Sequence, residues 1–296
     1  MSIDRQTAMA VPAAELIGAG TAAPGASGRR SRWRFTEILS VAWLAILIIA
    51  MLVLPTALNL NAQALGTKPL AGPSSSHLLG TDNLGRDLLA RALSGAHVSL
   101  AIGFGSVAIA AAIGIPIGMT AAYRRGVFSA TATFIVDVIL AFPGLILALT
   151  LSAFIGASFT SVMIAITVPM TPVFVRLAKA QAASVLEREY VEASRVIGTP
   201  MMAILRRDVL PNIAESMVSF ALVSVGNAIL IESGLAFLGL GVPPPQPTWG
   251  SMISAGQDYL TNGPQMIIVP GAFLLLTILS LNLLADKFLA EQQVIR

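Results

Sequence analysis

The chain has 296 residues, of which 55% are hydrophobic and only 11% are charged, and its formal net charge is +3. Soluble domains usually carry about 25% charged residues, so this composition excludes an ordinary water-soluble domain and indicates a protein embedded in lipid. Cysteine is absent, which excludes disulfides, thiolate metal sites and a thiol nucleophile.

The chain begins with a segment, residues 1–37, that is rich in Ala, Gly, Pro and Ser and ends in a basic cluster at Arg29, Arg30, Arg32 and Arg34. We expect a disordered tail that is anchored at the inner membrane surface. A cleaved signal peptide is the alternative, because Ala62-Gln63-Ala64 resembles a cleavage site. The preceding apolar run is longer than the roughly 7–15 residues of a signal-peptide core, which favours a tail.

Six apolar stretches follow, and each is long enough to cross a membrane as a helix of about 20 residues. The predicted spans are 38–58, 98–123, 129–156, 158–175, 213–238 and 264–285. Pro143-Gly144 is expected to kink the third span, and Pro169 and Pro172 to distort the fourth. The predicted fold class is therefore all-α, a polytopic bundle of about six transmembrane helices. Its predicted parts are the tail (1–37), the first helix (38–58), an external loop (59–97), a five-helix core (98–286) and a C-terminal segment (287–296).

The distribution of Lys and Arg predicts the orientation of the bundle. Only Lys68, Arg86 and Arg91, three of the 18 basic residues, fall in segments that would lie outside if the N-terminus were cytoplasmic. Because basic residues concentrate on the cytoplasmic side, we expect both termini to be cytoplasmic and the number of spans to be even.

The predicted external loop contains two short glycine motifs, Gly80-Thr81-Asp82 and Gly85-Arg86-Asp87. The glycines allow tight turns, and we expect the two carboxylates to pair with Arg86 or Arg91. The loop then either caps the second span or contacts an external binding protein. His77 near the carboxylates could bind a metal, but a solvated loop is the favoured interpretation and no metal site is predicted.

Polar residues inside the spans are candidates for a solute pathway, because charges are costly in the hydrocarbon core. Asp137 lies in the third span and is expected to face a pore, a partner helix or the inner interface. Asn227 and Glu232 lie on the fifth span, where Glu232, near the outer end, could simply reach water. For Asp137 and Glu232, structural pairing is the favoured interpretation and solute contact is the alternative. Gly114 and Gly118 form a Gly-x-x-x-Gly pattern that indicates close helix packing, with a dimer contact as one option.

The segment 176–212 is too polar to span the membrane and predicts two short helices. Leu186, Tyr190, Ala193 and Ile197 recur on one face of the first helix, and Met201, Ile204 and Leu205 form the second. Gly198 suits the position after the first helix, Thr199 an N-cap and Pro200 a first helical position, with Pro211 closing the unit. Such a segment either lies on the headgroups or docks a cytoplasmic partner.

The outer loop 239–250 carries Pro243, Pro244, Pro245 and Pro247, which stiffen it and disfavour a helix. Trp249 follows and is expected to act as an anchor at the membrane interface. A rigid external gate is the alternative function for this loop.

Sequence patterns for catalysis are missing. No Gly-x-x-x-x-Gly-Lys-Ser/Thr loop occurs, and no lysine follows a glycine, so no P-loop for ATP is predicted. No Ser/His/Asp arrangement is evident, and buried serines suit helix packing better than nucleophilic catalysis.

Three segments resemble a known family. Glu192-Ala193-Ser194, then Gly198, then Leu210-Pro211 resembles the Glu-Ala-Ala loop of ATP-binding-cassette (ABC) importer permeases, with complete spacing. Ser194 replaces the second Ala, and Asp208 stands where that family has Ile, which puts one apolar contact in doubt. The segments 77–87 and 232–250 resemble the second permease subunit type of the dipeptide/oligopeptide/nickel branch, although Ala236 stands where Ser is usual. The resemblance covers residues 77–286.

The resemblance implies a permease subunit that does no covalent chemistry and binds no cofactor. It implies that segment 184–211 docks on an ATPase through Glu192, Ala193, Ser194, Gly198, Leu210 and Pro211. The implied partners are a homologous permease, two P-loop ATPases that hold ATP and Mg, an extracytoplasmic binding protein and the bilayer of the bacterial inner membrane, with no nucleic acid. Peptides are the expected solute. The alternatives are nickel or another small solute, a proton-coupled secondary transporter working through Asp137 or Glu232, and an intramembrane enzyme.

Overall fold

The computed structural model describes residues 35–295, with side chains described to residue 288. Most of the predicted tail 1–37, including its basic cluster, lies outside the described residues. The described part is helical, and its nearest approach to a strand is an isolated bridge between Thr81 and Asp87. The predicted all-α fold class is confirmed.

The described helices follow one another along the chain with short connections. In chain order they are α1 (Phe35–Ala57), α2 (Leu88–Tyr123), α3 (Val127–Leu140), α4 (Gly144–Ile155), α5 (Phe159–Leu186), α6 (Glu189–Val196), α7 (Met201–Ile204), η1 (Leu205–Val209), α8 (Leu210–Phe237), α9 (Trp249–Gly256), η2 (Gln257–Tyr259) and α10 (Gln265–Ile295).

Five stretches of the described chain are helical, long and apolar enough to cross a membrane: α1, α2, α5, residues 201–237 and residues 265–288. A sixth candidate is the pair α3 and α4, which bends by 85° at its break. The break falls at the predicted Pro143-Gly144, because Pro143 lacks the N–H that would continue α3. By contrast, Pro169 and Pro172 do not interrupt α5.

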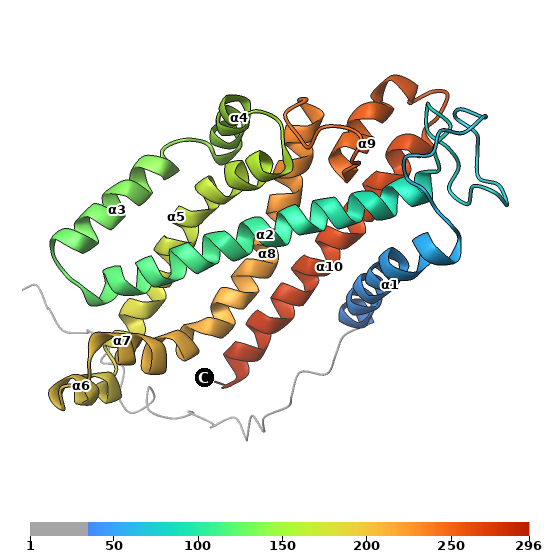
Figure 1. The fold of residues 1–296 in the computed structure, drawn as a ribbon. Helices are drawn as coiled ribbons and strands as arrows, with labels where there is room; N and C mark the ends of the chain where they lie inside the picture. The colour runs from blue at the N-terminus through green and yellow to red at the C-terminus, as the bar shows by residue number, and fades with distance from the viewer. Residues whose placement is uncertain (1–34, 296) are drawn as a thin grey trace, which may run out of the picture.

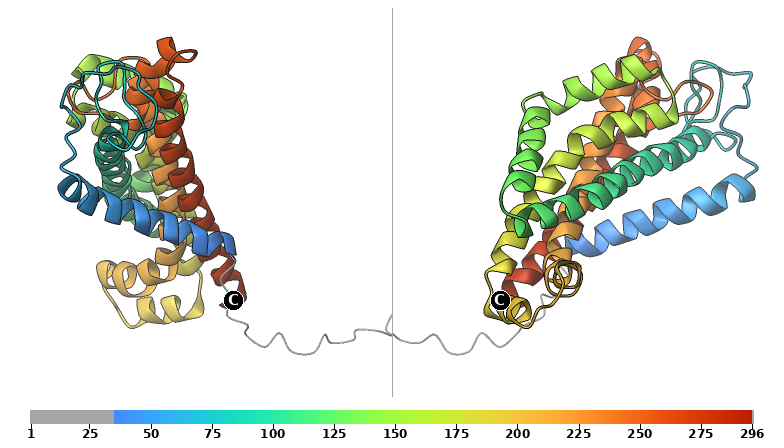
Figure 2. Two further views of the ribbon diagram at one scale, coloured as in Figure 1. Left: turned by 90° about the vertical axis from the view of Figure 1, so that its right-hand side faces the viewer. Right: turned by 60° about the vertical axis from the view of Figure 1, so that its left-hand side comes forward.

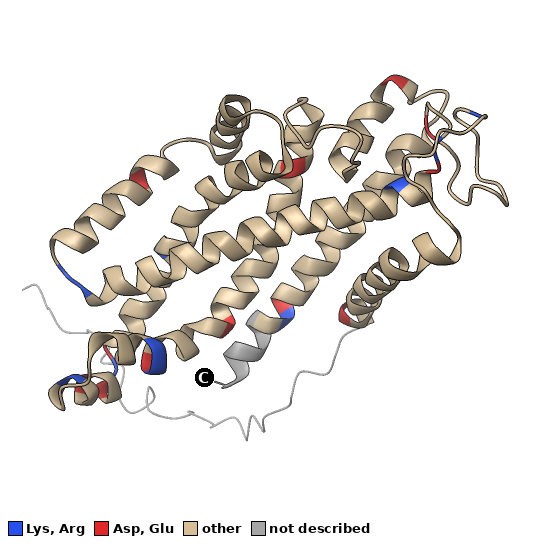
Figure 3. Cartoon of the chain, in the orientation of Figure 1, with Lys and Arg blue, Asp and Glu red and all other residues tan. Residues whose placement is uncertain are grey.

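Two ends of the molecule can be distinguished (Figure 1). One end, which we call the α6 end, holds α6, the start of α1 and the end of α10. The segment 58–87, α4 and α9 lie at the opposite end, which we call the α9 end. Charged residues are found mostly towards these two ends, and the middle parts of most helices carry few of them (Figure 3). This is the charge distribution expected of a bundle that crosses a bilayer.

Helix α2 is the centre of the bundle, and it packs closely on α5 at two glycines. A Cβ at Gly114 would lie 2.6 Å from the Phe174 Cβ, and one at Gly118 would lie 2.5 Å from the Val175 carbonyl oxygen. The Gly-x-x-x-Gly pattern therefore serves packing within the chain, and the predicted option of a dimer contact is wrong at these positions. A local pattern of small residues indicates close approach but does not name the approaching helix.

Helix α1 lies at the edge of the bundle, where it crosses α10 (Figure 2). The Trp43 Nε1–H donates to Thr277 Oγ1 at 3.2 Å, and the Trp43 ring meets the edge of Phe273. Near the α6 end, Glu37 and Lys287 form an ion pair at 3.3 Å and are both buried. One face of α1 is thus tied to α10, while the opposite face is apolar and exposed.

Two helix boundaries differ from the predicted ones. Helix α2 begins at Leu88, ten residues before the predicted 98, because Asp87 caps it and the charge of Arg91 is paired inside the fold. Helix α5 continues to Leu186, beyond the predicted end at 175. Polar and basic residues end an apolar run but not a helix, so hydropathy underestimates helices that project from the membrane.

Candidate functional site

The α6 end carries a compact helical projection, residues 187–209, which we call the α6 loop. Gly198 has a φ of +81°, a left-handed conformation that glycine adopts without strain. Its N–H donates to the Arg195 carbonyl, and the Thr199 N–H donates to the Ser194 carbonyl, both at 3.0 Å. The predicted role of Gly198 directly after the first helix is confirmed.

The α6 loop is anchored by Val191, which is fully buried. It packs in a small apolar cluster with Val185 of α5 and with Ile204, Leu205 and Val209 of the returning chain. The loop is therefore a packed unit with a fixed position relative to α5 and α8.

Of the predicted apolar face, Leu186 packs at the end of α5, but the three residues on and directly after α6 do not. Tyr190 is 44% exposed and Ile197 is 80% exposed. Two further apolar side chains, Val196 at 82% and Met202 at 70%, are also exposed. We call these four residues the α6 apolar patch. The periodicity identified apolar side chains of this segment, but the residue of α6 that packs against α5 and η1 is Val191, which is not one of them. Exposed apolar patches rimmed by polar residues mark interaction surfaces.

The second half of the α6 loop also differs from prediction. Pro200, not Thr199, precedes the first residue of α7 as its cap, and α7 continues through η1 into α8 without a break. Pro211 lies inside this continuous helical stretch, directly after the wider turns of η1, so it does not close the unit as predicted. Leu210 and Pro211 belong to the long helix, while Glu192 and Ala193 are exposed on α6 and the Ser194 hydroxyl donates to the Tyr190 carbonyl.

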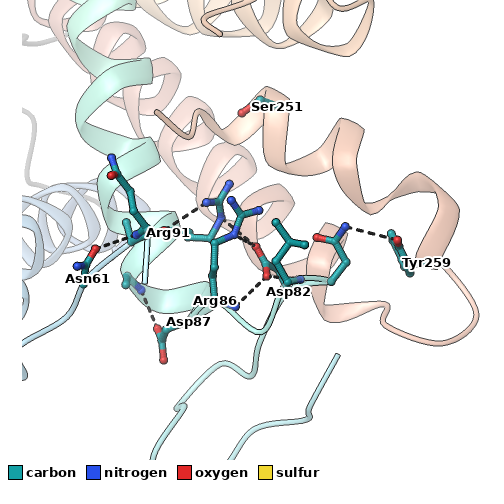
Figure 4. A network of polar contacts seen from close by, with 12 residues as sticks. Asn61, Asp82, Arg86, Asp87, Arg91, Ser251 and Tyr259 are labelled. Carbon is teal, nitrogen blue, oxygen red and sulfur yellow. Dashed lines mark hydrogen bonds and ion pairs between the residues drawn. The ribbon is translucent and has the colours of Figure 1, made fainter. Parts of the chain in front are cut away.

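At the α9 end, Asp82 organises the segment before α2 (Figure 4). Its carboxylate is almost fully buried and accepts hydrogen bonds from the backbone N–H groups of Leu84 and Arg86 at 2.8 and 2.9 Å. It also pairs with Arg86 Nε at 2.6 Å and with Arg91 Nε at 3.3 Å. The predicted pairing of Asp82 is confirmed, with both arginines at once.

Asp87 has a different role from the predicted one. It does not pair with an arginine: Oδ1 accepts from the Ala90 N–H at 2.8 Å and so caps α2, while Oδ2 lies 2.8 Å from His77 Nδ1. Thr81 Oγ1 donates to the Lys68 carbonyl at 2.7 Å and accepts from the Ala71 N–H, which ties the motif to the preceding loop. Among the described residues, no group of three or more His, Asp or Glu side chains is arranged to hold a metal ion.

The glycines of this motif allow a tight path. Gly80 and Gly85 have φ of +84° and +75°, and a Cβ at Gly85 would lie within 3 Å of the Gly66 backbone. The whole segment also rests on the start of α10, since Gln265 donates to the Leu70 carbonyl at 3.3 Å. The motif Gly80–Asp87 is therefore an ordered cap on α2, with its charges turned largely inward.

Glu232 is fully buried between α2, α8 and α9, so the expectation that it could reach water is wrong. Ser99 Oγ of α2 donates to its carboxylate at 3.3 Å and accepts from the Trp249 N–H at 3.2 Å. Trp249 is itself fully buried and donates its indole N–H to the Ala92 carbonyl at 3.0 Å. The predicted interfacial anchor is therefore a core residue, because α9 packs closely against α2 at Gly95 and against α8 at Gly250.

The other two predicted pathway residues, Asp137 and Asn227, lie on the surface of this chain. Asp137 of α3 pairs with Arg176 of α5 at 3.0 Å, and both side chains are more than half exposed. Asn227 on α8 is exposed, whereas Glu232 on the same helix is buried. The structure thus does not bring the three predicted pathway residues together.

Comparisons with known proteins agree with this geometry. Residues 114–290 match the family described as "Binding-protein-dependent transport system inner membrane component". The chain is 39% identical over 217 residues to the "Di/tripeptide transport system permease protein DppC" of Pseudomonas aeruginosa, covering 73% of this chain and 72% of the relative. It is 37% identical over 215 residues to the "Glutathione transport system permease protein GsiD" of Pectobacterium atrosepticum, covering 73% and 71%.

A third relative covers more of the chain. The "Putative peptide transport system permease protein BRA1093/BS1330_II1085" of Brucella suis is 36% identical over 263 residues, which is 88% of each chain. A solved structure titled "Inward facing conformations of the MetNI methionine ABC transporter: CY5 native crystal form" has a similar fold, with a TM-score of 0.55 and 22% identity over 70% of this chain and 97% of that one.

Proposed function

Because the chain belongs to the family of binding-protein-dependent transport system inner membrane components, we propose that it is the permease subunit of an ABC importer that carries short peptides. The observation that carries this proposal is the agreement of three relatives, at 36–39% identity, whose names refer to di- and tripeptides, glutathione and peptides. Nickel or another small solute is the weaker alternative, because none of these names points to it.

We propose that the α6 loop is the docking element for a cytoplasmic ATPase. The fixed position of the loop and its exposed apolar patch support this role, since a coupling element must transmit force without folding back on itself. Glu192, Ala193 and Ser194 lie on the same short helix, and Gly198 sets the turn behind it. Asp208 lies in η1 at a half-buried position, so it does not disturb the exposed patch.

In this arrangement the α6 end is cytoplasmic and both chain ends lie on that side. ATP and Mg bind to partner ATPase subunits, and a second, homologous permease completes the pathway. The α9 end then faces an external binding protein, which meets the ordered motif Gly80–Asp87. Asp137 and Asn227 are the exposed polar residues available to a pathway between the two permeases. Glu232 is proposed to position α9 and not to contact solute.

A charge placed in the α6 apolar patch tests the docking proposal. Ile197→Asp changes a side chain that is 80% exposed, so the variant is expected to fold and to reach the membrane normally. A buried interface does not tolerate an unpaired carboxylate, so the amount of P-loop ATPase that co-purifies with the chain is expected to fall at least about tenfold.

Leu65→Asp is the matched control, because Leu65 is 75% exposed at the opposite end of the molecule. It is expected to retain the ATPase fully. Equal ATPase recovery with both variants would show that the α6 loop does not dock the ATPase, and a wild-type chain that purifies without any ATPase would contradict the importer itself.

A further inference from the structure

A basic pocket of about 240 Å³ opens at the α6 end between four elements. It lies where α2 ends, α3 begins, α5 projects and α6 folds back. Its lining includes Ala121, Arg125, Lys179, Ala183, Glu187 and Arg195. Basic residues occur at the turn between α2 and α3 and on α6 (Figure 3), and both segments contribute to the lining of this pocket.

Three cations line this basic pocket against a single carboxylate, Glu187. In the part of the chain that the structure describes, Arg125, Lys179 and Arg195 make no ion pair with a carboxylate. Lys179 donates to Thr133 Oγ1 at 2.7 Å, and the Arg195 guanidinium lies 4.9 Å above the Tyr123 ring. Both cations are thus held in position by neutral groups, and their charge is available to an anion.

A second pocket, of about 290 Å³, lies between the same helices further into the bundle and is almost purely apolar. Its lining includes Ile117 of α2, several residues of α3 between Phe128 and Ile139, and Thr171 and Val175 of α5. We call it the apolar pocket.

The two pockets follow one another along a single face of α5. Thr171 and Val175 line the apolar pocket, and Lys179 and Ala183 line the basic pocket, at intervals of four residues. Four residues make about one helical turn, or roughly 6 Å, so the cations lie about one turn beyond the apolar lining. On α2, Ile117 and Ala121 show the same order.

We propose that the two pockets together bind one anionic phospholipid from the leaflet at the α6 end. The phosphate of the headgroup meets Arg125, Lys179 and Arg195, and an acyl chain lies in the apolar pocket. Basic pockets between membrane helices are suited to anionic lipid headgroups, and each nearby Lys or Arg adds attraction to a phosphate. A free phosphate ion would use the basic pocket alone and would leave an apolar pocket beside it unexplained.

The lipid headgroup would connect the α6 loop to the membrane helices. Arg195 belongs to α6, whereas Lys179 belongs to α5 and Arg125 to the turn after α2. A headgroup bound to all three ties the α6 loop to the membrane helices. The lipid contact does not depend on which solute the protein carries.

The test uses the full chain, reconstituted with its accompanying subunits in nanodiscs that contain a trace of photoactivatable lipid. The probe is phosphatidylglycerol with a diazirine in one acyl chain, and the matched probe is phosphatidylcholine with the same chain. We expect the phosphatidylglycerol probe to label residues 128–139 and 171–175 preferentially. Lys179→Gln combined with Arg195→Gln is expected to reduce this labelling at least about tenfold, because two headgroup cations are lost.

Two control variants separate the charge of the pocket from surface charge in general and from folding. Arg206→Gln with Arg207→Gln removes two exposed charges of η1 that do not line the pocket and is expected to leave labelling unchanged. Lys179→Arg with Arg195→Lys keeps both charges and is expected to restore labelling, which separates loss of charge from loss of folding.

Three outcomes would overturn the proposal. Equal labelling by the two probes would show that the headgroup charge is irrelevant. Loss of the preference in excess inorganic phosphate would show a site for free anions. Labelling of a partner subunit in place of α3 and α5 would show that protein covers the pockets. A failure of transport assays would leave this result unaffected, so the two proposals can be contradicted separately.

Discussion

Single residues decide how closely the central helices approach. At Gly118 the Cα hydrogen faces the Val175 carbonyl and Ala178, and any side chain there would have to displace the backbone of α5. At Gly271 on α10, by contrast, a Cβ would meet no heavy atom within 4 Å. Two glycines in apolar helices thus have opposite structural meanings, which only the packing of neighbouring helices distinguishes.

Gly118→Ala is expected to destabilise the protein by about 1–3 kcal/mol, because overpacking forces the backbone of α5 to shift. Gly271→Ala is expected to be neutral or slightly stabilising, because alanine is favoured over glycine in a helix by up to about 1 kcal/mol. Thermal unfolding of the two variants in the same detergent measures the difference. Equal melting temperatures would mean that α2 and α5 do not pack at these glycines.

Asp82 is the residue on which the α9 end depends. Asp82→Asn keeps the shape but removes the charge that pairs with Arg86 and Arg91, and breaking a buried ion pair costs about 3–5 kcal/mol. We expect faster hydrogen exchange in residues 66–87 and new tryptic cleavage at Arg86. Asp258→Asn is the control, since Asp258 is exposed on η2. Unchanged exchange in Asp82→Asn would contradict the structural role of the network.

Among the elements, α1 depends on α10 for its position. The ion pair of Glu37 and Lys287 closes one end of the contact, and Trp43 holds its middle. Leu47 of α1 is also buried in the main apolar cluster, while the opposite side of the helix is apolar and exposed, so polar and apolar contacts together determine which way the helix faces.

A double-mutant cycle tests this contact. Lys287→Met is expected to cost about 3–5 kcal/mol, because it removes the cation that faces the buried Glu37 carboxylate. Adding Glu37→Gln is expected to recover part of the loss, since the remaining amide is neutral. Chemical unfolding of the two single variants and the double variant gives the coupling energy. Strictly additive effects would show that the two side chains do not interact.

The elements also show how far the sequence alone predicts this fold. Hydropathy predicted the spans and Pro143 the break after α3, because both depend on local residues. The pattern of residues 186–197 predicted the short helix α6 but not its buried side, because Val191 packs in a cluster with residues of η1, which lies later in the chain. Glu232 and Trp249 were misplaced for the same reason: α9, which begins at Trp249, packs against α2 and α8 only because Gly95 and Gly250 let distant backbones meet.

At the scale of the whole molecule, the fold presents two different ends. The α9 end is closed by inward-facing charges, whereas the α6 end offers an exposed apolar patch and a basic pocket. The family motifs predicted which segments of the sequence form the α6 loop and the cap on α2 at the α9 end. They did not predict the adjoining pockets, whose residues come from four separate helices and the turn after α2.

We propose that this chain transports short peptides at the expense of ATP that its partner subunits hydrolyse. The most direct measurement is uptake of a radiolabelled dipeptide into proteoliposomes that contain the assembled transporter and its external binding protein. We predict accumulation that requires MgATP on the side of the α6 end, and that is lost with Ile197→Asp but kept with Leu65→Asp. Uptake that follows a proton gradient and proceeds without ATP would contradict the claim and would identify a secondary transporter.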